Sequence, residues 1–419
     1  MGGPASREIE FLRTDGRAAG AVLALTVLQL LMSVRFFHKY VDPWPWAAYV
    51  TFVIAGVLAC VVVLGSSRLL ACLTSRWMLA VALGALFALV SVAYPQADAL
   101  RSLGRGSDQD DCVRTLVGNV FAGRDPFGFG YFGDPCSTGP SEFLLYFPVE
   151  LSPWYFVLVP VLATLLGYWV LSQVVAHGLA VLLSLVQFCS LLFLEMSAVG
   201  SDMVLIAWLF AAAAVASRQG LHGRVRLLVV AGGAAYLLFA GSRLPLLLVA
   251  AGSLWVLVVA CGVRALRVAA PVVVLTAGLY LGSYVVAPAA FTPGHLIGKS
   301  AGIVNRLTGG TIVPPLLLGA VALSVLVALS VRAAGRAFVR LHYYGANVLI
   351  AALPMAAVAF WDLSRRGMDP ALWEGLHYLF LAVPMLLVAT GHWLQGLSLR
   401  TVVRVEAGGQ AVARSHRSR

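Results

Sequence analysis

Long apolar runs follow one another along almost the whole chain, and polar residues gather in the short intervals between them. A run of about 20 apolar residues crosses the ~30 Å hydrocarbon core of a bilayer as a helix, because a helix satisfies its own backbone polar groups. We therefore predict an all-α polytopic membrane protein with about twelve transmembrane helices. The predicted spans are residues 17–37, 46–65, 77–94, 154–174, 178–194, 202–217, 227–241, 243–262, 268–287, 311–331, 343–361 and 376–393.

One interval, residues 95–153, breaks this pattern. It carries eight of the 18 Asp and Glu residues of the chain and two of its six cysteines. Most connections between helices are only about 4–6 residues long, so a connection of this length and charge indicates a function of its own. We predict that it is the catalytic loop of a single transmembrane domain (residues 17–398), between a short N-terminal tail (1–16) and a basic C-terminal tail (399–419).

The composition supports a membrane protein and excludes other classes. Charged residues make up only 11% of the chain, against about 25% in soluble proteins, and the mean hydropathy is +0.90. The net charge of +11 does not indicate nucleic-acid binding, because the basic residues are spread over many short loops without a groove-reading motif. The first apolar run is too long for the core of a signal peptide, so we expect no cleavable one.

The basic residues fall on alternate loops, and this sets the predicted orientation. By the positive-inside rule their side is cytoplasmic, both tails included, in a multi-pass protein of the inner (plasma) membrane. The other side receives 14 of the 18 acidic residues, so the loop at 95–153 is predicted to be extracytoplasmic. The basic loop residues are Arg68, Arg76, Arg218, Arg224, Arg226, Arg264, Arg267, Arg332, Arg336 and Arg340.

The acidic loop itself contains a predicted amphipathic helix. Asp108 or Asp110 can cap its start and Gly123 can end it. We expect the helix to lie flat in the membrane interface, because its apolar residues recur at helical spacing on one face. Those residues are Val113, Leu116, Val117, Val120 and Phe121.

Cys112 and Cys136 share this loop, where an oxidising compartment allows a disulfide. The bridge would close a loop of about 25 residues and constrain the chain by a few kcal/mol. No pair of His or Cys residues has the spacing of metal ligands, so we predict no metal and no cofactor.

Several short motifs resemble a known family. The acidic residues 108–111 and the helix lead into Gly-Arg-Asp-Pro-Phe (123–127), then Gly-Asp-Pro (133–135) and Gly-Pro-Ser-Glu (139–142). This order resembles the first large outer loop of GT-C fold glycosyltransferases, above all the actinobacterial polyprenyl-phosphate-mannose-dependent mannosyltransferases. Phe127 stands where Tyr is usual, and the loop follows the third span rather than the first. Further matches are Gly200-Ser201-Asp202, Ser242-Arg243 and Trp373-Glu374-Gly375-Leu376-His377-Tyr378.

The resemblance implies an enzyme that transfers a sugar, mannose above all, from a polyprenyl-phosphate donor to a cell-envelope glycolipid or glycan on the outer side. Such transfer needs a general base for the acceptor hydroxyl and cations for the departing phosphate. The family's catalytic base is a loop aspartate, which carries over to Asp108, Asp110 or Asp111. For the phosphate the sequence offers Arg243, Lys299 and Arg306, and for the sugar or acceptor it offers His377, Trp373, Tyr378 and Asp202.

Each of these residues also has a plainer interpretation. The aspartate cluster can serve only as a helix cap, and Arg243 can extend its charge to the lipid headgroups. Lys299 and Arg306 can be ordinary loop charges, and Asp202 can cap or pair locally. His377, Trp373 and Tyr378 fit a belt of interfacial side chains.

A transporter or flippase for lipid-linked sugars is the alternative function. Transporters place ionisable residues near the bilayer midplane, often on broken helices. The interiors of the predicted spans are almost free of charge, and this absence favours the enzyme. A non-enzymatic envelope assembly factor would not need clustered carboxylates opposite phosphate-compatible cations.

Overall fold

The computed structural model describes residues 10–100, 109–152, 154–298, 335, 338–339, 342–352 and 376–398. The predicted span at 311–331 and residues 353–361 of the one at 343–361 lie outside the described residues. Asp108, Lys299, Arg306 and Trp373 lie outside them too, as does the side chain of His377.

The described residues form helices and no β-strand. Two isolated β-bridges are present among them, Phe129 with Pro135 and Thr138 with Arg243. Seven of its helices are long and apolar enough to cross a membrane, or eight if one bent pair counts as a span. An all-α, multi-pass membrane protein is therefore confirmed, whereas the count of twelve spans is not. The seven are Gly16–Tyr40, Pro45–Gly65, Arg76–Ala97, Tyr155–Ser172, Met203–Gly223, Leu246–Val286 and Phe380–Ser398.

The predicted span at 178–194 is bent in the structure. Residues 178–194 were expected to form one helix, but α10 (His177–Val186) continues as a 3-10 turn and meets α11 (Leu191–Ala198) at a bend of 78°. Extended backbone at Ser190 makes the break. The side chain of Ser33 accepts a hydrogen bond from the Leu191 amide (2.9 Å), which compensates for part of the interrupted helix bonding.

The predicted spans 243–262 and 268–287 form one apolar stretch of 41 residues. Within it α14 (Leu246–Cys261) and α15 (Leu266–Val286) are joined by a 3-10 turn that starts at Gly262 with φ +65°. Arg243 is extended and lies before α14 rather than inside it.

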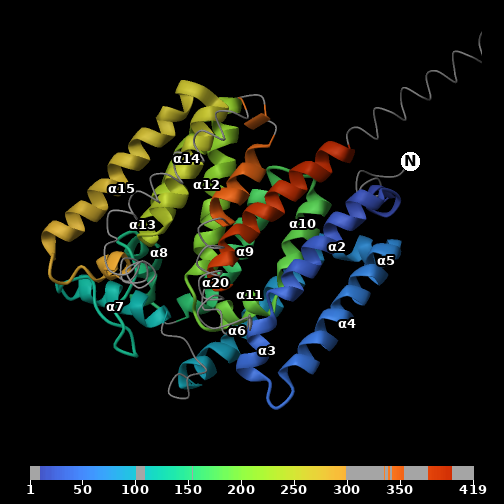
Figure 1. Cartoon of the computed structure of the whole chain (residues 1–419), viewed down its shortest axis with the longest axis horizontal. Helices are drawn as coiled ribbons and strands as arrows, with labels where there is room; N and C mark the ends of the chain where they lie inside the picture. Colours follow the sequence, from blue (N-terminus) through green and yellow to red (C-terminus); the bar gives the residue numbers. More distant parts are fainter. Residues whose placement is uncertain are drawn as a thin grey trace, which may run out of the picture. The chain divides into compact units, whose positions relative to one another are not determined.

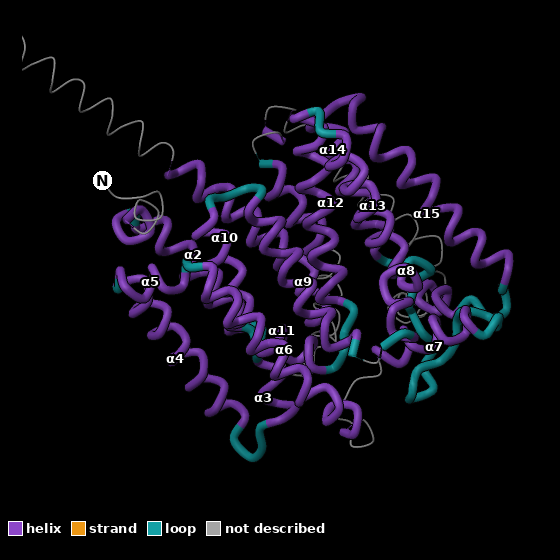
Figure 2. Tube along the Cα trace, turned by 180° about the vertical axis from the view of Figure 1, so that it is seen from behind, coloured by secondary structure: helices purple, strands orange, loops and turns teal. Residues whose placement is uncertain are grey.

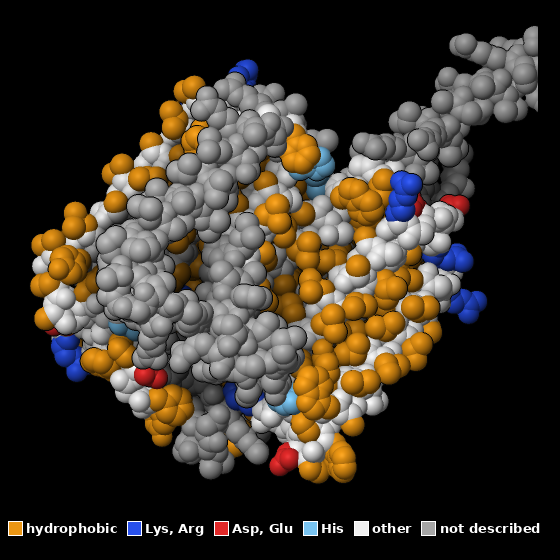
Figure 3. Space-filling model, in the orientation of Figure 1, with side chains coloured by type: hydrophobic (Ala, Val, Ile, Leu, Met, Phe, Trp, Pro, Cys, Tyr) orange, Lys and Arg blue, Asp and Glu red, His pale blue; other side chains and the backbone are white. Residues whose placement is uncertain are grey.

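The chain forms two compact units. The first contains Met1–Gly84, Tyr168–Leu192 and Leu386–Arg419. Within it α2 (Gly16–Leu31) packs on α4 (Pro45–Gly65), where Gly56 leaves room for the side chain of Leu30. The outer face of α4 is covered with exposed apolar side chains, as Figure 3 shows. Such a face is stable against lipid rather than water.

The second unit contains Ala85–Gly167 and Phe193–Met385. Its centre is α12 (Met203–Gly223), which is buried along most of its length. The helix α13 (Arg226–Ser242) packs between α12 and α15, and the three lie side by side in Figures 1 and 2. Gly232 permits the close contact, because a Cβ there would lie 2.6 Å from the Ser217 amide nitrogen.

The polar loop belongs to the second unit. It contains α7 (Gln109–Phe121), α8 (Glu142–Tyr146) and a 3-10 turn (Phe147–Glu150). The predicted apolar face of α7 is buried at Val113, Leu116 and Val117, whereas Val120 and Phe121 in its last turn are exposed. The flat position of α7 in the membrane interface stays a prediction.

Candidate functional site

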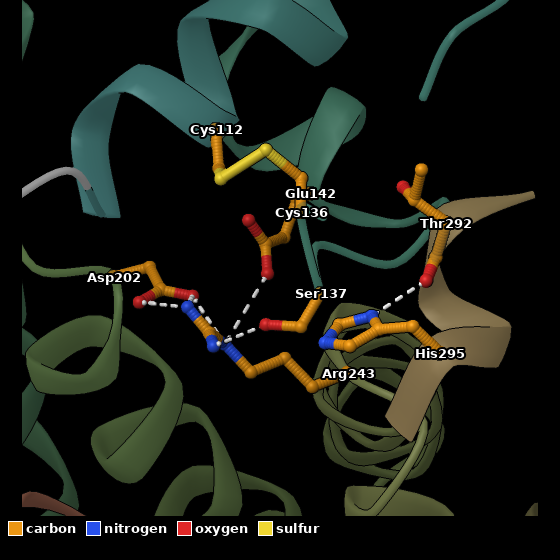
Figure 4. The surroundings of a disulfide bond; sticks show 8 residues. All are labelled: Cys112, Cys136, Ser137, Glu142, Asp202, Arg243, Thr292 and His295. Atoms are coloured by element: carbon orange, nitrogen blue, oxygen red, sulfur yellow. Dashed lines mark hydrogen bonds and ion pairs between the residues drawn. A yellow bond between two sulfur atoms is a disulfide. The ribbon is translucent and has the colours of Figure 1, made fainter. Parts of the chain in front are cut away.

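Arg243, between α13 and α14, is the centre of a buried ion pair. Its Nε donates to Asp202 Oδ2 (2.9 Å) and its Nη2 donates to Asp202 Oδ1 (2.8 Å). Its Nη1 donates to Ser137 Oγ (2.9 Å), as Figure 4 shows. Two parallel charge-assisted bonds fix the plane of the guanidinium. Burial lowers the pKa of Arg243, but Asp202, Tyr378 and Glu142 together raise it above its ordinary value, so the cation is retained.

Backbone contacts hold Arg243 in this position. The acidic loop pairs with the end of α13 through a bridge between Thr138 and Arg243 and through the amide of Gly139, which donates to the Ser242 carbonyl. Gly139 is required for this approach, because a Cβ would lie 2.2 Å from the Gly241 carbonyl oxygen. The Gly200-Ser201 turn, with Gly200 at φ +69°, sets Asp202 at the start of α12.

Glu142 is a second carboxyl group in the same place. Its side chain is completely buried, and its Oε1 lies 3.8 Å from Arg243 Nε. Burial, followed by the Asp202 carboxylate, raises the pKa of Glu142 well above its ordinary value, and Arg243 only partly opposes the rise. Glu142 is therefore a carboxyl group that holds its proton where an exposed glutamate would not.

Tyr146 lies against this group. Burial, and then the negative charge of Asp202, raise the pKa of its phenol. Within the described part of the chain, the Tyr146 hydroxyl has no partner at hydrogen-bond distance, whereas the protonated Glu142 carboxyl group can share a hydrogen bond with Asp202. Buried polar atoms are normally satisfied, so the Tyr146 hydroxyl is available to water or a ligand.

A second polar network adjoins the first. Tyr94 donates to Asp110 Oδ2 (2.7 Å), and Arg114 Nη2 donates to the Tyr94 hydroxyl (2.6 Å). Asp110 is fully buried, and Arg114 Nε lies 3.6 Å from its Oδ2. The guanidinium of Arg114 also lies over the ring of Phe156, 5.0 Å from its centroid.

Two contacts join the networks. The ring of Phe156 stacks on Tyr94 (5.7 Å between centroids) and on Tyr146 (5.8 Å). A Cβ at Gly200 would lie 2.9 Å from the Tyr94 ring and 3.0 Å from Asp110 Cβ, so the turn that places Asp202 also contacts Asp110. We call the joined set the carboxylate centre: Tyr94, Asp110, Arg114, Glu142, Tyr146, Asp202 and Arg243.

The disulfide between Cys112 and Cys136 borders the centre, with an S–S distance of 2.12 Å. It ties the first turn of α7 to the residue before Ser137 (Figure 4). His295 lies on the other side of Ser137 in the same view. Its Nδ1 is hydrogen-bonded to the Thr292 carbonyl oxygen (2.7 Å), so its Nε2 edge is presented to the cluster.

The structure thus brings together three residues named from the sequence, Asp110, Asp202 and Arg243. Asp111 is half-buried on α7, and Tyr378 on α20 (Leu376–Leu379) is close enough to influence Arg243. Asp108, Lys299, Arg306 and Trp373 lie outside the described residues. The roles assigned to all these residues stay predictions.

Sequence reasoning missed four members of the centre: Tyr94, Arg114, Glu142 and Tyr146. One signal was present, because Asp110 and Arg114 are four residues apart on one helix, a spacing at which opposite charges pair. Glu142, Asp202 and Arg243 each fall in a motif of the family resemblance, but no local pattern pairs them, because they are far apart in sequence.

Within the described residues, no group of three His, Cys, Asp or Glu side chains is arranged to hold a metal ion. No protein family model, curated protein or solved structure matches the chain.

Proposed function

We propose that the chain is an integral-membrane glycosyltransferase of GT-C type. It would transfer a sugar, mannose above all, from a polyprenyl-phosphate donor to a hydroxyl of a cell-envelope glycolipid or glycan on the outer side of the membrane. The observation that supports this most is the carboxylate centre. It gathers three acidic groups, Asp110, Glu142 and Asp202, with the cations Arg114 and Arg243 in one unit of a membrane protein.

The chemistry needs no metal. The acceptor hydroxyl gives its proton to a carboxylate while its oxygen bonds to the anomeric carbon. The bond between that carbon and the phosphate oxygen breaks, and the polyprenyl phosphate leaves with the electron pair. A positioned base contributes about 10²- to 10⁴-fold to such a step, and a nearby guanidinium stabilises the charge that develops on the phosphate.

The base is proposed to be Asp110 or Asp111, in the first turn of α7, or Asp108, which lies outside the described residues. Asp110 is oriented by Tyr94 and Arg114, whereas Asp111 is half-buried on the same turn. Arg243 is held by Asp202 and Ser137 in the structure, so it would act on a phosphate as a fixed charge.

The test is transfer of a radiolabelled sugar from its polyprenyl phosphate to a glycolipid acceptor by purified, reconstituted protein. Asp108→Asn, Asp110→Asn and Asp111→Asn are compared with Asp134→Asn, an exposed carboxylate of the same loop. At least one of the first three should lose about 10²-fold or more in rate while keeping its thermal midpoint. Full activity in all three variants would show that none of these aspartates is the catalytic base. If no polyprenyl-phosphate sugar reacts, the protein is not a glycosyltransferase of this type.

One observation favours a second candidate, a proton-coupled transporter for lipid-linked sugars. Glu142 is buried, has a raised pKa and lies beside an Arg–Asp pair, which is an arrangement used in proton relays. Exchange of a labelled lipid-linked sugar across proteoliposomes, driven by a pH gradient and abolished in Glu142→Gln, would favour transport. Product formation without exchange would favour the enzyme.

A further inference from the structure

Four arginines surround a cavity at the opposite end of α13 from the carboxylate centre. The cavity measures about 740 Å³. None of the described residues that line it is acidic, and its walls are otherwise apolar or glycine. The lining residues are Gly220, Leu221, Arg224, Arg226, Val229, Val230, Arg264 and Arg267.

The backbone is shaped to form this cavity. α12 and α13 converge where Gly220 contacts the next helix, because a Cβ there would lie 2.6 Å from the Val229 amide nitrogen. Arg224 ends α12 in the left-handed region, at φ 56° and ψ 29°. It is the one non-glycine residue with positive φ in the described chain. Glycine is the usual residue at such a position, so the arginine is kept there at a conformational cost.

The first turn of α13 opens on the same cavity. Its N-cap residue is Val225, which has no side chain that could accept from the free amides, and Arg226 follows directly. Helix N-termini carry a partial positive charge and unpaired N–H donors. Three further guanidinium groups, from Arg224, Arg264 and Arg267, border the same space. Charge and donors therefore both favour an anion, and phosphate fits guanidinium groups through paired hydrogen bonds.

The apolar part of the cavity wall indicates that the ligand has an apolar portion beside its phosphate group. Leu221, Val229 and Val230 line the cavity beside the arginines, and Val230 is exposed on the helix surface. A free anion gains nothing from such contacts, whereas a phosphate ester with an acyl chain gains hydrophobic burial. The positive-inside rule alone accounts for arginines on this side, but it does not require them to share one cavity.

The cavity is separate from the carboxylate centre. α13 has 17 residues, which corresponds to roughly 25 Å of helix. Arg226 starts the helix and Arg243 directly follows its end, so the two sites lie about one hydrocarbon thickness apart.

We propose that the four-arginine cavity binds the phosphate group of an anionic phospholipid in the leaflet predicted to be cytoplasmic. The arginines and the start of α13 hold the phosphate, and the acyl chain lies along Val229 and Val230. Basic pockets between membrane helices on the cytoplasmic side are suited to such headgroups. The site is independent of the chemistry proposed for the carboxylate centre.

The test uses full-length protein in mild detergent and counts bound lipid by native mass spectrometry during titration with phosphatidylglycerol. Phosphatidylcholine and inorganic phosphate serve as parallel ligands. In Arg264→Gln/Arg267→Gln we expect phosphatidylglycerol to bind roughly 25-fold more weakly, about fivefold per arginine. The matched control is Arg13→Gln/Arg17→Gln, which removes two exposed arginines from the first unit and should change the affinity less than about twofold.

Arg224→Gly separates binding from folding. Glycine relieves the left-handed backbone, so the lipid-free protein should unfold at the same or a higher temperature. Its stabilisation by phosphatidylglycerol should nevertheless shrink. Equal binding of phosphatidylcholine, or equal weakening in the control pair, would overturn the proposal. Inorganic phosphate that binds as tightly as phosphatidylglycerol, with the same sensitivity to Arg264→Gln/Arg267→Gln, would support the phosphate site and overturn the lipid as its source.

Discussion

At the scale of single residues, Arg243 shows what sequence reasoning could and could not provide. The motifs Ser242-Arg243 and Gly200-Ser201-Asp202 make Arg243 and Asp202 candidate site residues. Their bidentate ion pair could not be predicted, because the two residues are 41 positions apart and lie at the ends of different helices. The pairing also changes the expected role, since a guanidinium bonded to a carboxylate would act on a phosphate as a fixed charge and not as a mobile ligand.

A first prediction concerns this pair. Asp202→Asn should destabilise the protein by about 3–5 kcal/mol, because it leaves the buried guanidinium of Arg243 without its carboxylate. The double variant Asp202→Asn/Arg243→Met should be less destabilised than the sum of the two single variants, since no buried charge then remains unpaired. Chemical unfolding in detergent micelles measures the four free energies. Strictly additive losses would show that the two side chains do not interact.

A second prediction follows from the raised pKa of Glu142. The folded protein keeps a proton that an unfolded glutamate releases near pH 4.3. Stability should therefore be fully present below that pH and should decrease as the pH rises toward the folded pKa, with a limiting slope of about 1.4 kcal/mol per pH unit. Glu142→Gln mimics the protonated form, so this decrease should be absent from its profile.

Thermal midpoints measured from pH 4 to pH 8 test this, with Glu150→Gln as the control, an exposed carboxylate of the same loop. The wild type and Glu150→Gln should show the decrease and Glu142→Gln should not. Parallel profiles for all three proteins would mean that Glu142 releases its proton normally in the fold.

At the scale of the elements, patterns within one segment were predicted best. The predicted span at 46–65 corresponds to α4 and the predicted amphipathic helix of the acidic loop corresponds to α7, and the bounds agree within a few residues. Periodicity and length are local properties, and a helix in lipid depends on little else. The bend at Ser190 is not predicted from the sequence, because the 178–194 run is mostly apolar and contains no proline. The hydrogen bond from the Leu191 amide to Ser33, which accompanies the break, joins residues far apart in sequence, so no local pattern contains it.

A third prediction uses two neighbouring glycines of α13. Gly232→Ala should destabilise the packing of α12 on α13 by about 1–3 kcal/mol, because the new methyl group meets the backbone of Ser217. Gly233→Ala is the matched control, since nothing lies within 4 Å of its Cβ position. It should be neutral or stabilise the helix by up to about 1 kcal/mol. Equal losses in both variants would show that helix propensity, and not the contact with Ser217, sets the effect.

At the scale of the whole molecule, the sequence predicted the class and the alternation of charge but not the architecture. The repeated apolar runs identified a multi-pass membrane protein, because lipid selects apolar helices directly. The division into two compact units could not be read from the chain, since each unit combines segments from distant parts of it. The sidedness of the protein is likewise a property of the whole chain, and it remains a prediction from the positions of the arginines.

The final prediction tests that sidedness. Phe129 lies in the acidic loop and is 61% exposed, whereas Val263 lies in the turn between α14 and α15 and is 81% exposed. Phe129→Cys and Val263→Cys are made separately in a background in which Cys60, Cys72, Cys189 and Cys261 are serine and the disulfide is retained. If charge sets the orientation, a membrane-impermeant maleimide added to intact spheroplasts should label Phe129→Cys at once and Val263→Cys only after permeabilisation. The opposite pattern would place the carboxylate centre on the cytoplasmic side, where an extracytoplasmic acceptor could not reach it. Labelling of both variants before permeabilisation would contradict the alternation of loops on which the orientation depends.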